Sequence, residues 1–262
     1  MDLRGYKLGV ATSEAVKTLI DRVVTYLPEE AADAVERAYA YADECHDGQH
    51  RKSGEPYIAH PLETALFLAD LHLDDQTIVA ALLHDVVEDC GVSLEEIERR
   101  FGPGVSKLVD GVTKLTRMDS RLHDPSELIP ELLDDPDNLY AENLRKMLVS
   151  MAEDIRVVLI KLADRLHNMQ TLDALAPEKR RRIAQETLDI YSPLAHRLGI
   201  WEIKWQLDDL AFRHLNEEKY REISKILAAK RTEREDYIER VTTGLREELE
   251  RFGVTAEVIG RP

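Results

Sequence analysis

One apolar segment of the sequence, residues 78–87, carries a histidine and an aspartate side by side, His84 and Asp85. The segment has the composition of a buried helix, and burying an ionised carboxylate beside an imidazole is costly unless a partner compensates it. A divalent metal ion compensates both groups at once, because imidazole nitrogens and carboxylate oxygens are ordinary metal ligands. Glu88 and Asp89 follow one helical turn later, which is more acid than the packing of a buried helix requires.

The composition predicts a helical protein. Only 6% of the 262 residues are aromatic, and the chain contains 12 Gly and 10 Pro. Long runs of Ala, Leu, Glu, Arg and Lys favour helices over a β-sandwich. We therefore expect an all-α fold.

The charge and the cysteine content exclude several classes of protein. A net charge of −16 argues against a general affinity for DNA or RNA, which needs a basic surface. It does not exclude a small phosphorylated substrate, because a local basic loop or a bound metal reverses the field in a pocket. Cys45 and Cys90 have no metal-binding spacing. No apolar run approaches about 18 residues and no signal-peptide core is present, so we expect a cytoplasmic protein without a membrane span.

Capping residues and apolar periodicity indicate where helices begin. Pro28 and Pro61 each begin one, Asp74 caps the helix that carries His84, and Ser93 opens a capping box. Further helices are expected from Thr12, around residues 105–112, and over residues 141–151, 154–173, 177–191, 201–216 and 218–252.

Two segments differ from the helical pattern. Residues 118–140 are acidic and contain three prolines, which is typical of a surface loop. Residues 253–260 alternate in polarity and are rich in β-branched side chains, which favours a strand.

Four residues from separated positions are the candidate metal ligands: His60, His84, Asp85 and Asp164. Asp164 lies in a second mostly apolar segment. Two imidazoles and two carboxylates form a mixed nitrogen and oxygen site, suited to Mn, Fe or Zn.

Taken singly, these residues have simpler explanations. A histidine before a proline, such as His60, is more often a helix cap or a core partner. Asp164 could pair with Lys161 or Arg165. The combined pattern, with its later members in apolar segments, favours metal binding more strongly.

The pattern His…His-Asp…Asp is that of the HD phosphohydrolase superfamily. Within it, several segments resemble the hydrolase domain of Rel/SpoT-type alarmone enzymes, and they occur in the same order along the chain. These segments are Gly48–Pro61, Ala81–Asp89, Asp110–Leu115 and Ile160–Met169, with Tyr191–Gly199 similar to the helical segment that follows the domain in long members. The resemblance covers roughly residues 15–250.

The resemblance implies a Mn(II)-dependent hydrolase that removes the 3′-pyrophosphate from ppGpp and pppGpp and leaves GDP or GTP. The metal ligands it implies are the four candidates above. The resemblance also implies roles for three other groups of residues. The acidic pair Glu88 and Asp89 would act on water, and Arg51, Lys52 and Ser53 would form the nucleotide-contacting loop. Asn168 and Thr171 would line the nucleoside pocket.

The chemistry of these residue types agrees with that reaction. A metal ion lowers the pKa of its bound water and neutralises phosphate oxygens. An arginine such as Arg51 binds phosphate bidentately, and a carboxylate one turn from the ligands accepts a proton from water. Asp164, Asn168 and Thr171 are spaced to share one helix face, along which the nucleoside would lie.

The resemblance also predicts the organisation of the chain. Residues 1–200 would form the HD-type hydrolase domain, and residues 201–262 a helical linker with the start of a synthetase domain that only the full-length protein contains. A catalytically silent, nucleotide-binding regulatory domain is the main alternative, although such domains lose ligands that this chain retains. A dNTP or cyclic-nucleotide phosphohydrolase is disfavoured by the loop at residues 51–57. Oligomeric state and the choice between ppGpp and pppGpp stay open.

Overall fold

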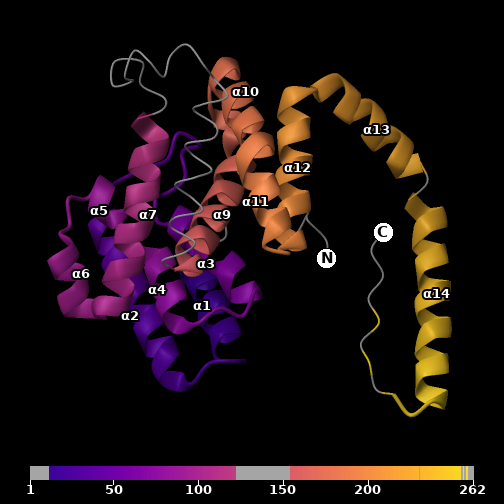
Figure 1. The fold of residues 1–262 in the computed structure, drawn as a ribbon, viewed down its shortest axis with the longest axis horizontal. Coiled ribbons are helices and arrows are strands. Elements are labelled where there is room, and N and C mark those ends of the chain that lie inside the picture. Colours follow the sequence, from indigo (N-terminus) through magenta and orange to yellow (C-terminus); the bar gives the residue numbers. More distant parts are fainter. Residues whose placement is uncertain (1–11, 122–153, 230, 255, 257, 259–262) are drawn as a thin grey trace. The chain divides into compact units, whose positions relative to one another are not determined.

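The computed structural model describes residues 12–121, 154–229, 231–254, 256 and 258. All regular structure in these residues is helical, apart from one isolated antiparallel bridge between His50 and Pro56, so the predicted all-α fold is confirmed. The chain forms two compact units that divide after Ala211, and Figure 1 labels their helices. None of the described helices is both long and apolar enough to cross a membrane.

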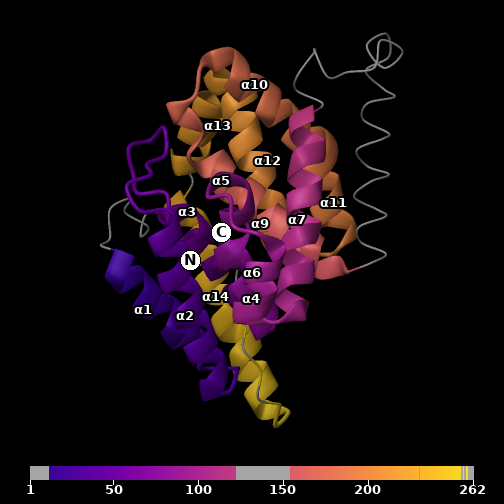
Figure 2. The same cartoon turned by 90° about the vertical axis from the view of Figure 1, so that its left-hand side faces the viewer.

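The first unit is built around an apolar helix, α4 (Asp75–Leu83). Asp74 caps this helix as predicted, because its Oδ1 accepts a hydrogen bond from the Thr77 amide at 3.0 Å. Every residue of α4 from Thr77 onward is buried, so the helix needs packing partners on all sides. These partners are α2 (Glu29–Cys45), α3 (Ala59–Asp70), α7 (Pro103–Arg121) and α9 (Ile155–Gln170) (Figure 2).

Shorter elements complete this unit. Ser93 caps α6, since its Oγ accepts a hydrogen bond from the Glu96 amide at 3.2 Å, and Gly102 ends the helix with a φ of 89°. The remaining elements are α1 (Thr12–Val23), α5 (Val86–Asp89), α6 (Leu94–Phe101), η2 (Leu172–Ala174), α10 (Pro177–Glu186), η3 (Thr187–Tyr191) and α11 (Ser192–Arg197).

Several predicted boundaries need correction. The α3 helix begins at Ala59, two residues before Pro61, and the helix predicted over residues 154–173 ends at Gln170. The helix predicted over residues 177–191 passes into a π-helical turn, η3. The α7 helix continues to Arg121, into the segment predicted to be a loop; the rest of that segment and the helix predicted over residues 141–151 lie outside the described residues.

The second unit begins at Phe212, within α12 (Trp201–Leu215). The helix predicted over residues 218–252 is two successive helices, α13 (Glu217–Ala229) and α14 (Arg231–Arg251). The described residues of the predicted strand, Gly253, Val254, Ala256 and Val258, belong to no strand, and its other positions lie outside the described residues.

A close approach between α7 and α9 makes Gly111 sensitive to substitution. A Cβ at this position would lie 2.7 Å from Cγ2 of Val157, a buried β-branched side chain with little freedom to move. We expect Gly111→Ala to lower the free energy of unfolding by about 1–3 kcal/mol, the usual cost of overpacking.

Gly104→Ala is the matched control, since its Cβ would meet only the flexible end of the exposed Gln76 side chain. This variant should be neutral or gain up to about 1 kcal/mol from helix propensity. Urea denaturation of both variants measures the difference; equal stabilities would contradict the close approach.

Candidate metal centre and active site

The four candidate ligands come from three places in the first unit. His60 is the second residue of α3, and Asp164 lies within α9. His84 and Asp85 do not lie inside one continuous helix, as the sequence suggested: α4 ends at Leu83, and Asp85 precedes α5. The pair therefore occupies a turn between two helices, in which both residues keep right-handed α backbone angles.

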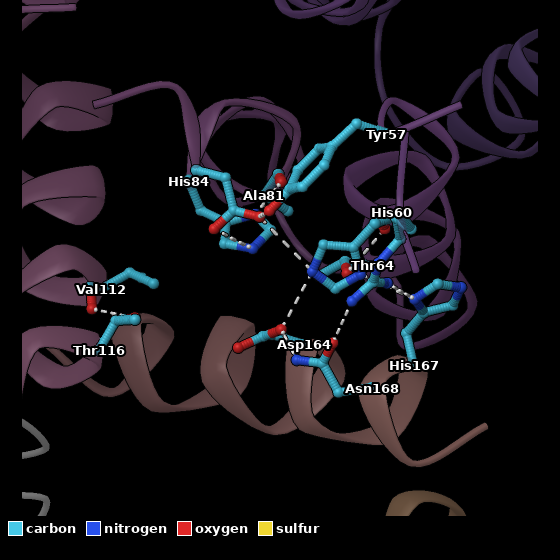
Figure 3. Close-up of polar contacts among 12 residues, drawn as sticks. Tyr57, His60, Thr64, Ala81, His84, Val112, Thr116, Asp164, His167 and Asn168 are labelled. Atoms are coloured by element: carbon cyan, nitrogen blue, oxygen red, sulfur yellow. Dashed lines mark hydrogen bonds and ion pairs between the residues drawn. The ribbon is translucent and has the colours of Figure 1, made fainter. Parts of the chain in front are cut away.

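The ligand atoms converge (Figure 3). His84 Nε2 lies 3.1 Å from Asp85 Oδ1, and His60 Nε2 lies 3.6 Å from Asp85 Oδ2. One ligand atom from each of these three residues lies within 4.8 Å of the other two, which is close enough for them to share one ion. Asp164 joins them from α9, with its Oδ1 3.1 Å from His60 Nε2.

Asp164 serves two neighbours at once. Its Oδ1 faces His60, while its Oδ2 accepts a hydrogen bond from Lys161 Nζ at 2.9 Å. Burial opposes ionisation of this carboxyl, but Lys161 and His60 outweigh burial and hold the pKa of Asp164 well below its usual range. The pairing with Lys161 thus accompanies the cluster rather than replacing it. Arg165 pairs instead with Glu186 at 2.9 Å.

The two imidazoles are suited to binding a cation. His84 Nδ1 lies 2.7 Å from the Ala81 carbonyl oxygen, so it donates there and leaves the Nε2 lone pair free. That Nε2 is buried and has no hydrogen-bond partner among the described residues. Burial lowers the pKa of His60, which keeps this imidazole neutral as a ligand must be. The orphaned nitrogen and the nearby carboxylates fit a divalent metal ion.

The acidic pair after the ligands has two different environments. Glu88 is half-buried, and its Oε1 is enclosed without a hydrogen bond from any residue that the structure describes. Burial, and then the charge of Asp85, raise the pKa of Glu88. A raised pKa makes a carboxylate a stronger base near neutral pH. Asp89 is exposed and lies beside the hydroxyl of Tyr57.

The three predicted loop residues are not equivalent. Arg51 reaches into the site, where NH1 lies 2.9 Å from His167 Nδ1 and NH2 donates to Asn168 Oδ1 at 2.5 Å. Lys52 is exposed, and the hydroxyl of Ser53 donates to Glu55 within the loop. The structure therefore brings Arg51 to the ligand cluster and leaves the other two residues at the loop surface.

The predicted nucleoside face on α9 is partly assembled. Asn168 Nδ2 donates to Asp164 Oδ1 at 2.5 Å, so this amide bridges the carboxylate and the guanidinium of Arg51. Thr171 lies at the end of α9, where its hydroxyl lies 3.3 Å from the His167 carbonyl oxygen. Asn168 is thus part of the cluster, whereas Thr171 borders it.

Two further residues belong to the site and were not predicted. Tyr57 donates its hydroxyl hydrogen to Asp85 Oδ2 at 2.9 Å, and its ring stacks on His46. His167 lies with its Nδ1 2.7 Å from His60 Nδ1. Burial, then His60 and Arg51, hold the pKa of His167 well below its usual range, so this imidazole is neutral. The sequence feature that could have identified Tyr57 is its place in the predicted loop segment. For His167, that feature is its position next to Asn168.

The helical fold and the His, His-Asp, Asp cluster define a protein of the HD type. The family model described as "HD domain" matches residues 38–201, and the chain belongs to this family. The predicted resemblance to Rel/SpoT-type enzymes is confirmed by curated relatives. The bifunctional (p)ppGpp synthase/hydrolase SpoT of Escherichia coli strain K12 is 45% identical over 94% of this chain and 33% of its own length.

Other relatives agree with this grouping. A probable guanosine-3′,5′-bis(diphosphate) 3′-pyrophosphohydrolase of a Synechocystis strain is 49% identical over 86% of the chain and 28% of its own length. The chain thus spans about a third of the length of the curated relatives it matches. A solved structure, described as a metazoan ortholog of SpoT that hydrolyses ppGpp, is 28% identical over 70% of this chain and 96% of its own, with a TM-score of 0.51.

Proposed function

We propose that this chain is a divalent-cation-dependent hydrolase that removes the 3′-pyrophosphate from ppGpp or pppGpp and leaves GDP or GTP. The observation that carries the proposal is the convergence of two imidazoles and two carboxylates, with an orphaned nitrogen on His84. The names of the relatives supply the substrate class. Residues 1–200 would form the hydrolase domain, and residues 201–262 the helical linker to a synthetase domain.

We propose Mn²⁺ as the cofactor, held by His60, His84, Asp85 and Asp164. This mixed donor set suits Mn²⁺ but is compatible with other divalent ions. When bound, the cation neutralises phosphate oxygens and lowers the pKa of a coordinated water. Tyr57 keeps Asp85 oriented by its hydrogen bond to Oδ2, and Lys161 does the same for Asp164.

The proposed reaction is attack by water on the phosphorus attached to the ribose 3′-oxygen. A bond forms between the water oxygen and that phosphorus, and the bond from phosphorus to the 3′-oxygen breaks, so that pyrophosphate leaves. The 3′-oxygen takes a proton from solvent and ends as a hydroxyl. Glu88 would take the proton from water, since it is the half-buried acid with the raised pKa. Asp89 is its exposed neighbour and would relay the proton to solvent.

Arg51 is the residue placed to meet the phosphates. Its guanidinium contacts His167 and Asn168 beside the ligands, and a guanidinium binds phosphate oxygens through paired N–H donors. Asn168 would then be free to contact the nucleoside. Lys52, exposed on the same loop, adds positive charge at the entrance.

The test is to incubate the protein with ppGpp and Mn²⁺, with and without a chelator, and to identify the products by anion-exchange chromatography. We expect GDP and pyrophosphate with Mn²⁺ and intact ppGpp with the chelator. Binding of ppGpp without turnover would favour the silent regulatory domain instead. Release of the 5′-phosphates, or preference for a dNTP, would show that the substrate class is wrong.

A further inference from the structure

A ring nitrogen of His167 faces two other nitrogens, and their chemistry fixes where its proton lies. Arg51 NH1 lies 2.9 Å from His167 Nδ1. A guanidinium has only donors, so His167 Nδ1 must be the acceptor in this pair. A neutral imidazole has one acceptor nitrogen and one N–H, and the proton of His167 therefore lies on Nε2.

The same nitrogen determines the tautomer of His60. His60 Nδ1 lies 2.7 Å from His167 Nδ1, which is already assigned as the acceptor. His60 Nδ1 must consequently be the N–H donor, and its other nitrogen, Nε2, carries the lone pair. That lone pair faces two carboxylates, at 3.1 Å in Asp164 and 3.6 Å in Asp85. These carboxylates compete with His167 for the His60 proton, and a cation bound between them favours the same tautomer as His167 does.

We infer that His167 is a positioning residue, which holds His60 in the tautomer that binds the metal, and that Arg51 in turn fixes the tautomer of His167. The inference rests on the proposed metal site and adds a residue to it. His84 obtains the same orientation from a backbone carbonyl, that of Ala81. Among the described residues, His60 Nδ1 has only the side chain of His167 for this purpose. Figure 3 shows His60 between Asp164 and His167.

Burial makes the hydrogen bond effective. His60 is 2% exposed and His167 is 5% exposed, so water does not readily replace a lost acceptor. Without one, His60 gains by moving its proton to Nε2, where Asp164 accepts it. The metal-binding lone pair would then be lost. The consequence of losing His167 is therefore a change in metal affinity, beyond any change in stability.

The first readout uses the metal-free protein, so it does not depend on the proposed function. Long-range ¹H–¹⁵N NMR of the histidine rings reports which nitrogen of His60 is protonated. We expect the Nδ1–H form in the wild type and the Nε2–H form in His167→Leu. An Nε2–H form in the wild type, or no change in the variant, would overturn the inference.

The second readout is the dissociation constant for Mn²⁺, measured by electron paramagnetic resonance. We expect His167→Leu to bind about 10- to 100-fold more weakly, the usual loss when an outer partner of a metal-binding histidine is removed. His167→Asn should stay within a few-fold of wild type, because its amide oxygen can replace Nδ1. His167→Gln should bind Mn²⁺ as weakly as His167→Leu, since its amide extends to the Nε2 position. If His167→Leu does not fold, the comparison of His167→Gln with His167→Asn replaces it.

Leu166→Ala is the matched control for general damage. Leu166 is fully buried beside His167 but has no polar atom to accept a hydrogen bond. This variant should melt at a lower temperature and still bind Mn²⁺ like the wild type. Equal Mn²⁺ affinity in wild type and His167→Gln would overturn the role of His167 and leave the proposed metal site standing. A wild type that binds no Mn²⁺ would overturn the metal site as well.

Discussion

Asp85→Ala is expected to abolish both Mn²⁺ binding and hydrolysis of ppGpp. The carboxylate of Asp85 lies near both imidazoles, 3.1 Å from His84 Nε2 and 3.6 Å from His60 Nε2. Its loss removes a ligand and one acceptor for the hydroxyl of Tyr57. We expect the Mn²⁺ affinity to fall by more than the roughly 100-fold that removal of an outer partner costs.

A thermal melt with and without Mn²⁺ checks this prediction separately from turnover. A ligand that binds only the folded state raises the melting temperature, so Mn²⁺ should stabilise the wild type and leave Asp85→Ala unaffected. Asp47→Ala is the control, because Asp47 is an exposed loop aspartate. It should retain both binding and hydrolysis. A full complement of Mn²⁺ in Asp85→Ala would refute the ligand assignment.

The double variant Glu88→Gln with Asp89→Asn is expected to retain Mn²⁺ and to lose turnover by about 100-fold or more, the usual contribution of an acid–base group. Amides of the same size cannot accept the proton from water, while the four ligands are untouched. Most of the loss should already appear in Glu88→Gln, since Glu88 is the half-buried acid with the raised pKa.

Measuring kcat and bound Mn²⁺ in the same variants tests this prediction. Glu98→Gln, on the exposed side of α6, is the matched control and should hydrolyse ppGpp at the wild-type rate. Near-normal rates in the double variant would exclude a proton-transfer role for the pair. Loss of Mn²⁺ together with activity would instead make these residues part of the metal site.

The helical fold could be predicted from the sequence because its signals are local. The caps at Asp74 and Ser93 are read from neighbouring residues, and both occur where expected. The break between Leu83 and Val86 could not be predicted in this way. Apolar periodicity continues through it, so no local signal in the sequence marks the break.

In the candidate site, too, some features could be predicted from the sequence and others could not. His60, His84, Asp85 and Asp164 follow a spacing that sequence reasoning could recognise, and the structure brings them together. The hydrogen bond of His167 to His60, by contrast, joins residues 107 positions apart, and nothing in either local sequence indicates the contact.

The exposure of the loop residues could not be predicted from the sequence either. Arg51, Lys52 and Ser53 are consecutive, yet only Arg51 turns toward α9. The turn that separates them closes through the Gly54 amide, which donates to the Arg51 carbonyl oxygen at 2.9 Å. Which side chain a short turn directs inward depends on its backbone geometry, and residue types alone do not specify this geometry.

The most direct test of the central claim is the hydrolysis of ppGpp by metal-stripped protein as Mn²⁺ is added back, with bound Mn²⁺ measured in the same samples. The account predicts that GDP and pyrophosphate form in proportion to the bound ion and that hydrolysis reaches its maximum at one ion per chain. Hydrolysis by the metal-free protein, or intact ppGpp when one Mn²⁺ is bound per chain, would contradict it.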